Sequence, residues 1–207
     1  MASARLLPRL AESLFRGETW PSQAAIAESV GAAPGSLHPW LQALVYQRVL
    51  LSDDNGFRVD RDRLLRYFSA VRIAAMRPVR AFTTSLQPEE IHARLTEAGI
   101  AHAFGFFTAA NLYAFFEPRR EIQLFIAPGS REAVRLASAG RNLVGDDSMR
   151  VEPFEEPLSQ LGILARAGLP ITAPLQTVLD LRAHPEGGAH ADFLEKNLLP
   201  RILGGRR

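Results

Sequence analysis

The first sixty residues change their hydrophobic period once, and this change constrains the fold more than any other feature. Apolar residues recur at helical spacing in three short stretches and then alternate on both sides of Asn55-Gly56. Gly17 and Gly31 end the first two stretches, and Asn-Gly is a strong signal for a tight hairpin turn. We therefore expect helices over residues 2–15, 22–30 and 36–47, then a strand, turn and strand over 49–59.

The composition is that of a globular protein. The chain has 207 residues, of which 47% are hydrophobic and 22% are charged, and it has no cysteine. The missing cysteines exclude disulfides, thiolate zinc sites and cysteine nucleophiles. No apolar run reaches the length of a membrane span, and the start lacks the apolar core of a signal peptide. The expected location is cytoplasmic, with no membrane contact.

The charges are unevenly distributed along the chain. Residues 1–80 hold 11 arginines against seven acidic residues, whereas residues 81–207 hold 13 basic against 15 acidic residues. A basic front and a slightly acidic back suggest two modules with different partners. Chance is the alternative explanation for an asymmetry of this size.

The second half alternates between strand and helix patterns. Asp60 can cap a helix over 61–76 that connects the modules, with a boundary near 77–80. Further strands are expected over residues 79–83, 100–104, 121–127, 149–154 and 162–167. Further helices are expected over residues 88–98, 108–116, 130–139, 173–183 and 189–203. Mixed strands and helices favour an α/β sheet domain over 79–207.

The front of the chain resembles the winged helix-turn-helix of bacterial regulators over residues 1–60. The most specific part is Ile26–Gly31, and the apolar residues after it dock the third helix on the first two. Those residues are Leu37, Leu41, Leu44, Val49 and Leu50, and Ser36 begins the same pattern. The resemblance implies binding of double-stranded DNA, with the third helix in the major groove and a homodimer reading two half-sites.

Carried onto this sequence, the resemblance marks polar residues on the second and third helices and on the wing. They are Ser22, Gln23, Ser36, His38, Gln42, Arg48, Asn55 and Arg58. The wing arginines can reach phosphates and so position the protein without reading sequence. A module that contacts only protein is the alternative.

Proline and tryptophan qualify this interpretation. Pro39 would interrupt the third helix, so we expect Ser36 to cap a shorter helix in which Pro39 falls in the first turn. Trp20 and Trp40 are expected to pack in the core rather than to serve as exposed anchors. The arginines of the helix 61–76, including Arg72, are expected on a solvated face rather than on DNA.

Three stretches of the second half resemble the sensor half of AbiEi-type antitoxin regulators, whose C-terminal domain has a nucleotidyltransferase-like sheet. They are 100–113, 121–126 and 167–182. Nucleotidyl transfer needs a turn of small residues to hold the triphosphate. It also needs two carboxylates, with one residue between them, to bind magnesium. Here Phe106 follows Gly105, and Gln123 stands where the second carboxylate would be, two residues after Glu121. We therefore expect an α+β chain whose second domain is a degenerate nucleotidyltransferase fold, without metal, cofactor or catalysis.

The remaining titratable residues give weaker signals. The five histidines show no pair at helical metal spacing, and His184 and His190 flank a Gly-Gly loop where solvated roles are expected. Glu152, Glu155 and Glu156 are expected in a surface loop.

Taken together, these patterns predict an antitoxin-like repressor. Its second domain would bind a toxin, a small molecule or its own copy. An active nucleotidyltransferase guided by the first domain, or a protein-interaction module, are the alternatives.

Overall fold

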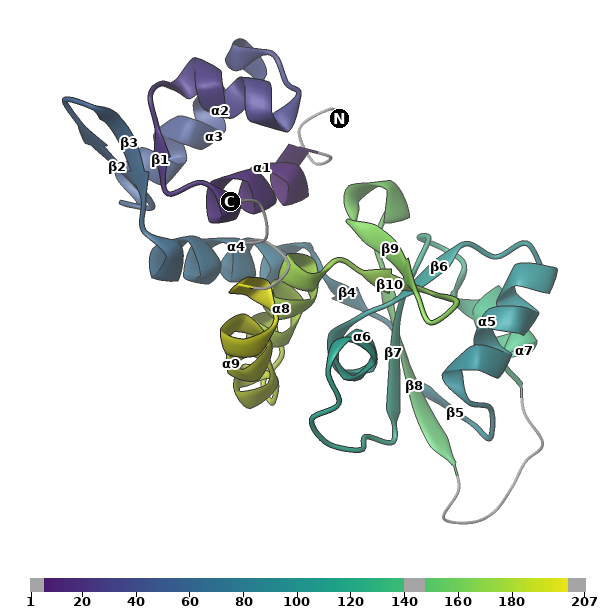
Figure 1. The fold of residues 1–207 in the computed structure, drawn as a ribbon. Helices are drawn as coiled ribbons and strands as arrows, with labels where there is room; N and C mark the ends of the chain where they lie inside the picture. Colours follow the sequence, from purple (N-terminus) through teal and green to yellow (C-terminus); the bar gives the residue numbers. More distant parts are fainter. Residues whose placement is uncertain (1–5, 140–147, 201–207) are drawn as a thin grey trace.

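The computed structural model describes residues 6–139 and 148–200, and their fold is α+β with two separate sheets (Figure 1). The first part of the chain forms three helices and a small sheet. The helices are α1 (Leu6–Arg16), α2 (Gln23–Val30) and α3 (Pro34–Tyr46). The strands are β1 (Thr19–Trp20), β2 (Leu50–Asp53) and β3 (Gly56–Val59), in the antiparallel order β1-β3-β2. The sequence pattern did not reveal β1, because two residues are too few to show a period.

The three helices pack as their apolar stripes predict. Leu14 of α1, Ile26 of α2 and Leu41 of α3 are all buried in one core. The Ser22 hydroxyl caps α2 by accepting a hydrogen bond from the Ala25 amide at 3.1 Å, and Gly31 ends that helix in the left-handed conformation. The helical pattern and the glycine stop were therefore predicted correctly.

The third helix corrects the expectation about its start. It begins at Pro34, with Ala33 as the residue before the first turn, so Pro39 lies inside the helix. Ser36 is not the cap, and its hydroxyl donates a hydrogen bond to the Ala33 carbonyl instead. Pro34 supplies the fixed backbone angle that a first helical residue needs, and this favours the earlier start.

The hairpin turn lies over residues 53–56, the four residues that the sequence pattern places between the two strands. Asp54 and Asn55 form the turn, and Gly56 is the first residue of β3, paired with Asp53. Gly56 has a φ of 122°, and a Cβ there would lie 2.2 Å from the carbonyl oxygen of Trp20. The glycine is required by this close approach between the hairpin and β1.

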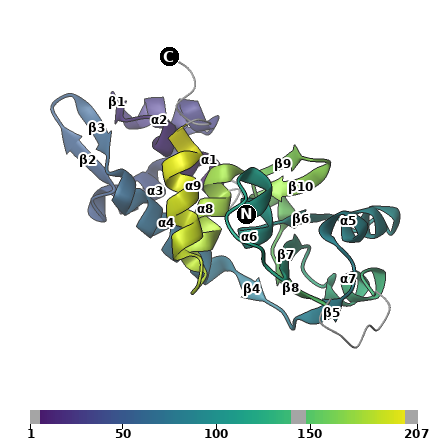
Figure 2. The same cartoon turned by 60° about the horizontal axis from the view of Figure 1, so that its bottom comes forward.

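A long helix joins the two parts of the molecule. Helix α4 (Arg61–Ala75) is capped by Asp60, which accepts a hydrogen bond from the Arg63 amide at 3.0 Å. It packs against α1 on one side and against α8 (Pro174–Ala183) on the other (Figure 2). The expected boundary near 77–80 coincides with β4 (Arg77–Pro78), which is already part of the second sheet.

The second sheet has seven strands in the described part of the chain. They are β4, β5 (Phe82–Thr84), β6 (His102–Phe104), β7 (Glu121–Ile126), β8 (Met149–Glu155), β9 (Ile163–Arg166) and β10 (Leu169–Thr172). Their order is β4-β8-β7-β6-β10-β9, with β5 also paired to β8. β7 is parallel to β8 and β10 is parallel to β6, whereas the other pairs are antiparallel.

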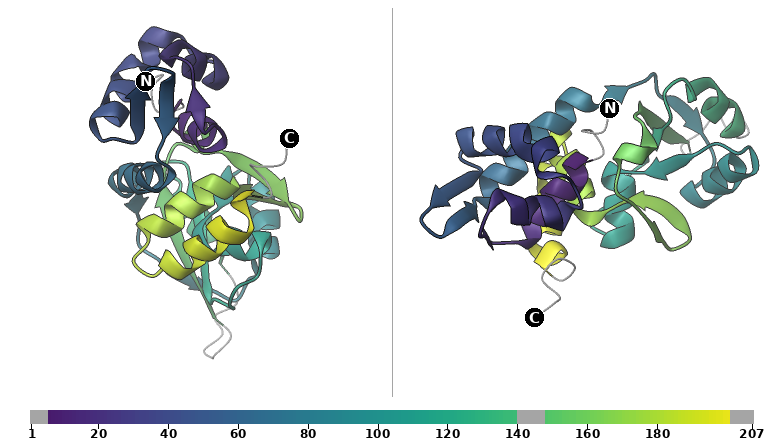
Figure 3. Two further views of the ribbon diagram at one scale, coloured as in Figure 1. Left: turned by 60° about the vertical axis from the view of Figure 1, so that its left-hand side comes forward. Right: turned by 90° about the horizontal axis from the view of Figure 1, so that it is seen from above.

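Helices cover the sheet from two sides, and the N-terminal elements lie at the far end of the molecule (Figures 1 and 3). Helices α5 (Pro88–Glu97) and α7 (Arg131–Ala137) lie on one side, and α6 (Phe106–Tyr113) lies on the other together with α8 and α9 (Gly188–Asn197). No helix in the described ranges is long and apolar enough to cross a membrane.

Several boundaries in this half differ from the predicted ones. The strand β10 was not predicted, because Ala167 and Gly168 at positive φ turn the chain back after only four residues of β9. Helix α6 starts two residues early, at Phe106. The first predicted helix from residue 2 and the last one to 203 extend outside the described residues.

Candidate functional site

The eight residues marked for DNA contact all lie at or near the surface of the first part of the chain. Ser22 and Gln23 stand at the start of α2, and Gln23 is half-buried. Ser36, His38 and Gln42 lie exposed on α3. The remaining three are also exposed: Arg48 follows α3, Asn55 lies in the hairpin turn and Arg58 lies in β3.

Some of these side chains already make internal contacts. The His38 Nδ1 lies 3.1 Å from the Gln23 Oε1, and this contact ties the start of α2 to α3. The hydroxyls of Ser22 and Ser36 hydrogen-bond to the local backbone. Within the described part of the chain, the Gln42 side chain makes no hydrogen bond, so its amide is available for a partner.

The hairpin presents one arginine outward and two acids at its tip. Arg58 pairs with Leu51 on one side and Thr19 on the other, while its neighbours Phe57 and Val59 pack against the core. Alternation along the strand therefore points Arg58 away from the core. Asp53 and Asp54 flank the turn, so the tip itself carries negative charge.

The charge excess of the first eighty residues is not concentrated on α3. That helix has no charged residue at all. Several of the arginines are held in ion pairs within the chain: Arg16–Glu12, Arg61–Glu18, Arg63–Asp60, Arg72–Glu156 and Arg72–Asp180. Around α3, the exposed cations are therefore Arg48 and Arg58.

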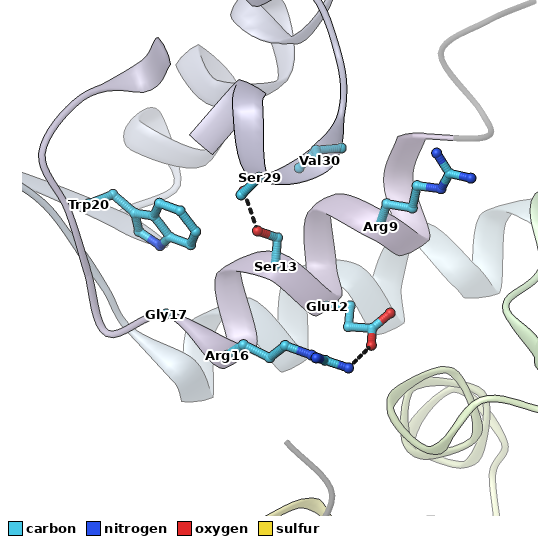
Figure 4. Close-up of a pocket in the computed structure, with 8 residues that line it drawn as sticks. All are labelled: Arg9, Glu12, Ser13, Arg16, Gly17, Trp20, Ser29 and Val30. Atoms are coloured by element: carbon cyan, nitrogen blue, oxygen red, sulfur yellow. Dashed lines mark hydrogen bonds and ion pairs between the residues drawn. The ribbon is translucent and has the colours of Figure 1, made fainter. Parts of the chain in front are cut away.

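The two tryptophans are partly buried and pack against the core, as expected. The Trp20 indole forms one wall of an open pocket of about 540 Å³ between α1, β1 and the end of α2 (Figure 4). Across it, Ser13 and Ser29 hydrogen-bond to each other, and Arg16 pairs with Glu12. None of the lining residues belongs to α3 or the hairpin, so this pocket is separate from the candidate DNA-binding face.

Arg72 corrects the expectation of a solvated arginine face on α4. Its Nε donates to Asp180 of α8 at 2.8 Å, and its two terminal nitrogens donate to the Glu156 carboxylate. The Arg72 and Glu156 side chains are 11% and 5% exposed, and that of Asp180 is fully buried. Glu156, expected in a surface loop, therefore helps to fix α4 to the second half.

Titration of the Asp180 carboxyl makes the stability of the fold depend on pH. Burial raises its pKa from 3.8 to about 6, although Arg72 opposes the shift. The folded state then binds the proton more tightly than the unfolded state. The stabilisation from this group is full below about pH 3.8 and is lost as the pH rises through about 6.

We predict that Asp180→Asn removes this pH dependence, because the amide keeps the shape without titrating. Relative to the variant, the natural chain should lose up to about 3 kcal/mol of unfolding free energy between pH 4 and pH 7. Urea unfolding at a series of pH values measures this difference. A difference that does not change with pH would contradict the assignment.

Gln123 occupies the centre of the second sheet on the side that faces α6. Its Oε1 accepts a hydrogen bond from the Phe107 amide at 3.1 Å, and its Nε2 donates to Glu152 at 3.1 Å. Its own backbone amide donates to the Thr108 hydroxyl at 2.9 Å. The side chain is therefore locked, and residue 123 as a whole is only 1% exposed.

This arrangement closes the end of a helix that would otherwise attract an anion. The first amides of α6 lack helical partners and carry partial positive charge. The side-chain carbonyl of Gln123 accepts a hydrogen bond from one of these amides, that of Phe107. Phe106 has a φ of 46°, and the centroid of its ring lies 4.6 Å from that of Phe154. A phosphate group at this helix end would have to displace the Gln123 side chain from the Phe107 amide.

The sheet nevertheless gathers acidic side chains around Gln123. Glu121 lies two residues earlier on the same face of β7, and Glu152 lies opposite Gln123 on β8. The expectation of a loop for Glu152 and Glu155 was wrong, because both belong to β8. The alternation in 149–155 was the available signal. No group of three metal-ligating side chains occurs in residues 6–139 and 148–200.

The structure brings together two histidines from neighbouring elements, α5 and β6. The His92 Nδ1 of α5 lies 2.9 Å from the His102 Nε2 of β6, and His102 also contacts the Ile100 carbonyl. Burial lowers the pKa of His102.

The expectation that His190 is solvated was wrong: it is buried against the rings of Phe107 and Phe116, and burial lowers its pKa.

His184, on the other side of the Gly-Gly loop, is also held by neighbouring groups. His184 is half-buried, and its Nδ1 accepts a hydrogen bond from the Glu186 amide at 3.2 Å. Its ring contacts that of Phe107 edge-on. Both loop histidines therefore pack against α6 rather than facing only solvent.

Comparisons with protein-family models, with curated proteins and with solved structures returned no match. The resemblance to AbiEi-type regulators therefore stays a prediction from the residue pattern.

Proposed function

We propose that residues 6–60 act as a winged helix-turn-helix that binds double-stranded DNA. The observation that carries this proposal is the exposed polar face of α3. Ser36, His38 and Gln42 project from a helix whose opposite face, with Leu37, Leu41 and Leu44, is fully buried. A single helix fits the major groove, and an amide such as that of Gln42 can bond adenine edges.

The arrangement of the neighbouring elements supports the same function. The order α1, β1, α2, α3, β2, β3 places a hairpin after the exposed helix, as a wing requires. His38 and Gln42 are four residues apart and therefore share one face of α3. Arg48 and Arg58 add the phosphate contacts. Because one short helix reads few base pairs, we propose a homodimer on two half-sites.

For the second half we propose a non-catalytic role as the interaction domain of an antitoxin-like repressor. Gln123 supports this, because a neutral amide is a poor magnesium ligand and its hydrogen bonds hold it in place. Phe106, the first residue of α6, supports it further, because nucleotidyl transfer needs a small residue after Gly105 to hold the triphosphate.

DNA binding is predicted to be weakly dependent on salt. With two arginines at phosphates, the slope of log K against log salt concentration should be about −2 per protomer. Fluorescence anisotropy with duplex DNA at about 50 mM and about 200 mM salt measures this slope. Arg48→Ala and Arg58→Ala should weaken binding alike on all sequences.

A matched pair of glutamine variants tests the role of α3. Gln42→Ala should weaken binding to a preferred duplex by roughly 1–3 kcal/mol. Gln47→Ala, at the exposed C-terminal end of the same helix, should leave binding unchanged. The proposal fails if the protein at micromolar concentration binds no duplex at low salt. It also fails if Gln42→Ala and Gln47→Ala bind the preferred duplex with the same affinity.

A further inference from the structure

A groove runs along the junction between the two halves of the molecule. Two adjoining pockets, of about 120 and 200 Å³, share Pro8 and Ala11 of α1 with Gln176 and Leu179 of α8. Because the two pockets share these four lining residues, they lie side by side, and we call them together the junction groove. Its combined size is close to the lower limit of ligand pockets, roughly 300 Å³.

The walls of the junction groove are mostly apolar and come from both halves. Phe68 and Val71 of α4 line the first pocket, and Ile163 and Leu164 of β9 line the second. Ile163 and Leu164 are 36% and 48% exposed, so apolar surface is left uncovered at the rim. Apolar walls at an interface between modules are the usual setting of a small-molecule site.

The charges in the junction groove are already paired. Arg72 and Glu156 contribute to its floor, and every nitrogen of the Arg72 guanidinium donates to Glu156 or Asp180. At the other end, Arg16 pairs with Glu12. A charged ligand would lose its hydration without gaining an ionic partner. The Gln176 Nε2 already donates to the Asp180 Oδ1 at 2.8 Å. The neutral groups left to bond a ligand are therefore the amide of Gln160 and the side-chain carbonyl of Gln176.

From these contacts we infer that the junction groove binds a small, uncharged, largely apolar molecule that carries a hydrogen-bonding group for the Gln160 amide or for the side-chain carbonyl of Gln176. The ligand would touch α1 and α4 of the first half together with α8 and β9 of the second. This inference goes beyond the proposed function and does not depend on DNA binding.

Two dyes with one skeleton test the inference on the full-length chain. N-phenyl-1-naphthylamine is uncharged, and 8-anilinonaphthalene-1-sulfonate carries a sulfonate on the same rings. We expect the uncharged dye to bind one to one with enhanced fluorescence, and the sulfonated dye to bind at least about tenfold more weakly, a difference of about 1.4 kcal/mol.

Two leucine variants locate the dye. Leu164→Lys places an unpaired charge at the rim of the groove and should weaken binding of the uncharged dye roughly tenfold. Leu136→Lys changes a leucine that is 61% exposed on α7, outside the groove, and should leave binding unchanged.

Four results would overturn the inference. The first is no binding of the uncharged dye, and the second is equal binding of both dyes. The third is equal affinity in the two leucine variants. The fourth is an affinity that falls as protein concentration rises, which would show that a second copy of the chain covers the groove.

Discussion

Replacing Arg72 by alanine should lower the free energy of unfolding by about 3–5 kcal/mol at pH 7.5, because two carboxylates lose their shared buried partner. Asp180 is fully buried and Glu156 nearly so, and Arg72 contacts both. A chain of this size should then melt roughly 10 °C lower, which calorimetry measures directly.

The control for Arg72 lies on the same helix. Arg66→Ala removes an exposed arginine of α4 and should change the stability by no more than about 0.5 kcal/mol. The loss in Arg72→Ala should shrink at pH 5, because Asp180, with its raised pKa, then takes up a proton. Equal melting temperatures for the two variants would refute the structural role of the cluster.

Replacing Gly56 by alanine should destabilise the first module by about 2–4 kcal/mol, from backbone strain and steric overlap together. The new Cβ would lie 2.2 Å from the Trp20 carbonyl oxygen, at a φ of 122° that suits only glycine. Either the hairpin or β1 must move, so urea unfolding should report the loss. Gly35→Ala, in the first turn of α3 with nothing within 4 Å of the new Cβ, should cost nothing. If the two variants are equally stable, the close approach does not constrain the chain.

The Arg72 cluster also bears on how the two halves work together. Helix α4 follows directly from the hairpin. Its Arg72 donates hydrogen bonds to Asp180 of α8 and to Glu156, the residue after β8. Arg72 and Asp180 are 108 residues apart in the sequence, and their contact holds α4, and with it the first module, against α8 of the second. We therefore expect a ligand or partner at the second half to act on the orientation of α1 and α4.

The sequence predicted well those elements whose signals are local. Helix α2 with Ser22 and Gly31, helix α4 with Asp60, and helix α8 with Pro174 all lie within two residues of their predicted bounds. Each is defined by a cap or a proline next to an amphipathic run, and such groups act over one turn of helix. The eight candidate DNA-contacting residues, which the resemblance marks, all lie at or near the surface.

The sequence by itself determined the α+β class, the helices and hairpin of the first sixty residues, and the neutral residue at 123. Only the tertiary structure decided what Arg72, Gln123 and His190 do. Periodicity assigns a residue to a face of its own element, but it cannot tell which distant element covers that face. Arg72 meets Asp180 and Gln123 meets Glu152 only because the sheet and α8 bring them together. A buried charge or amide is tolerated only where such partners exist, and partners far apart in sequence leave no local pattern.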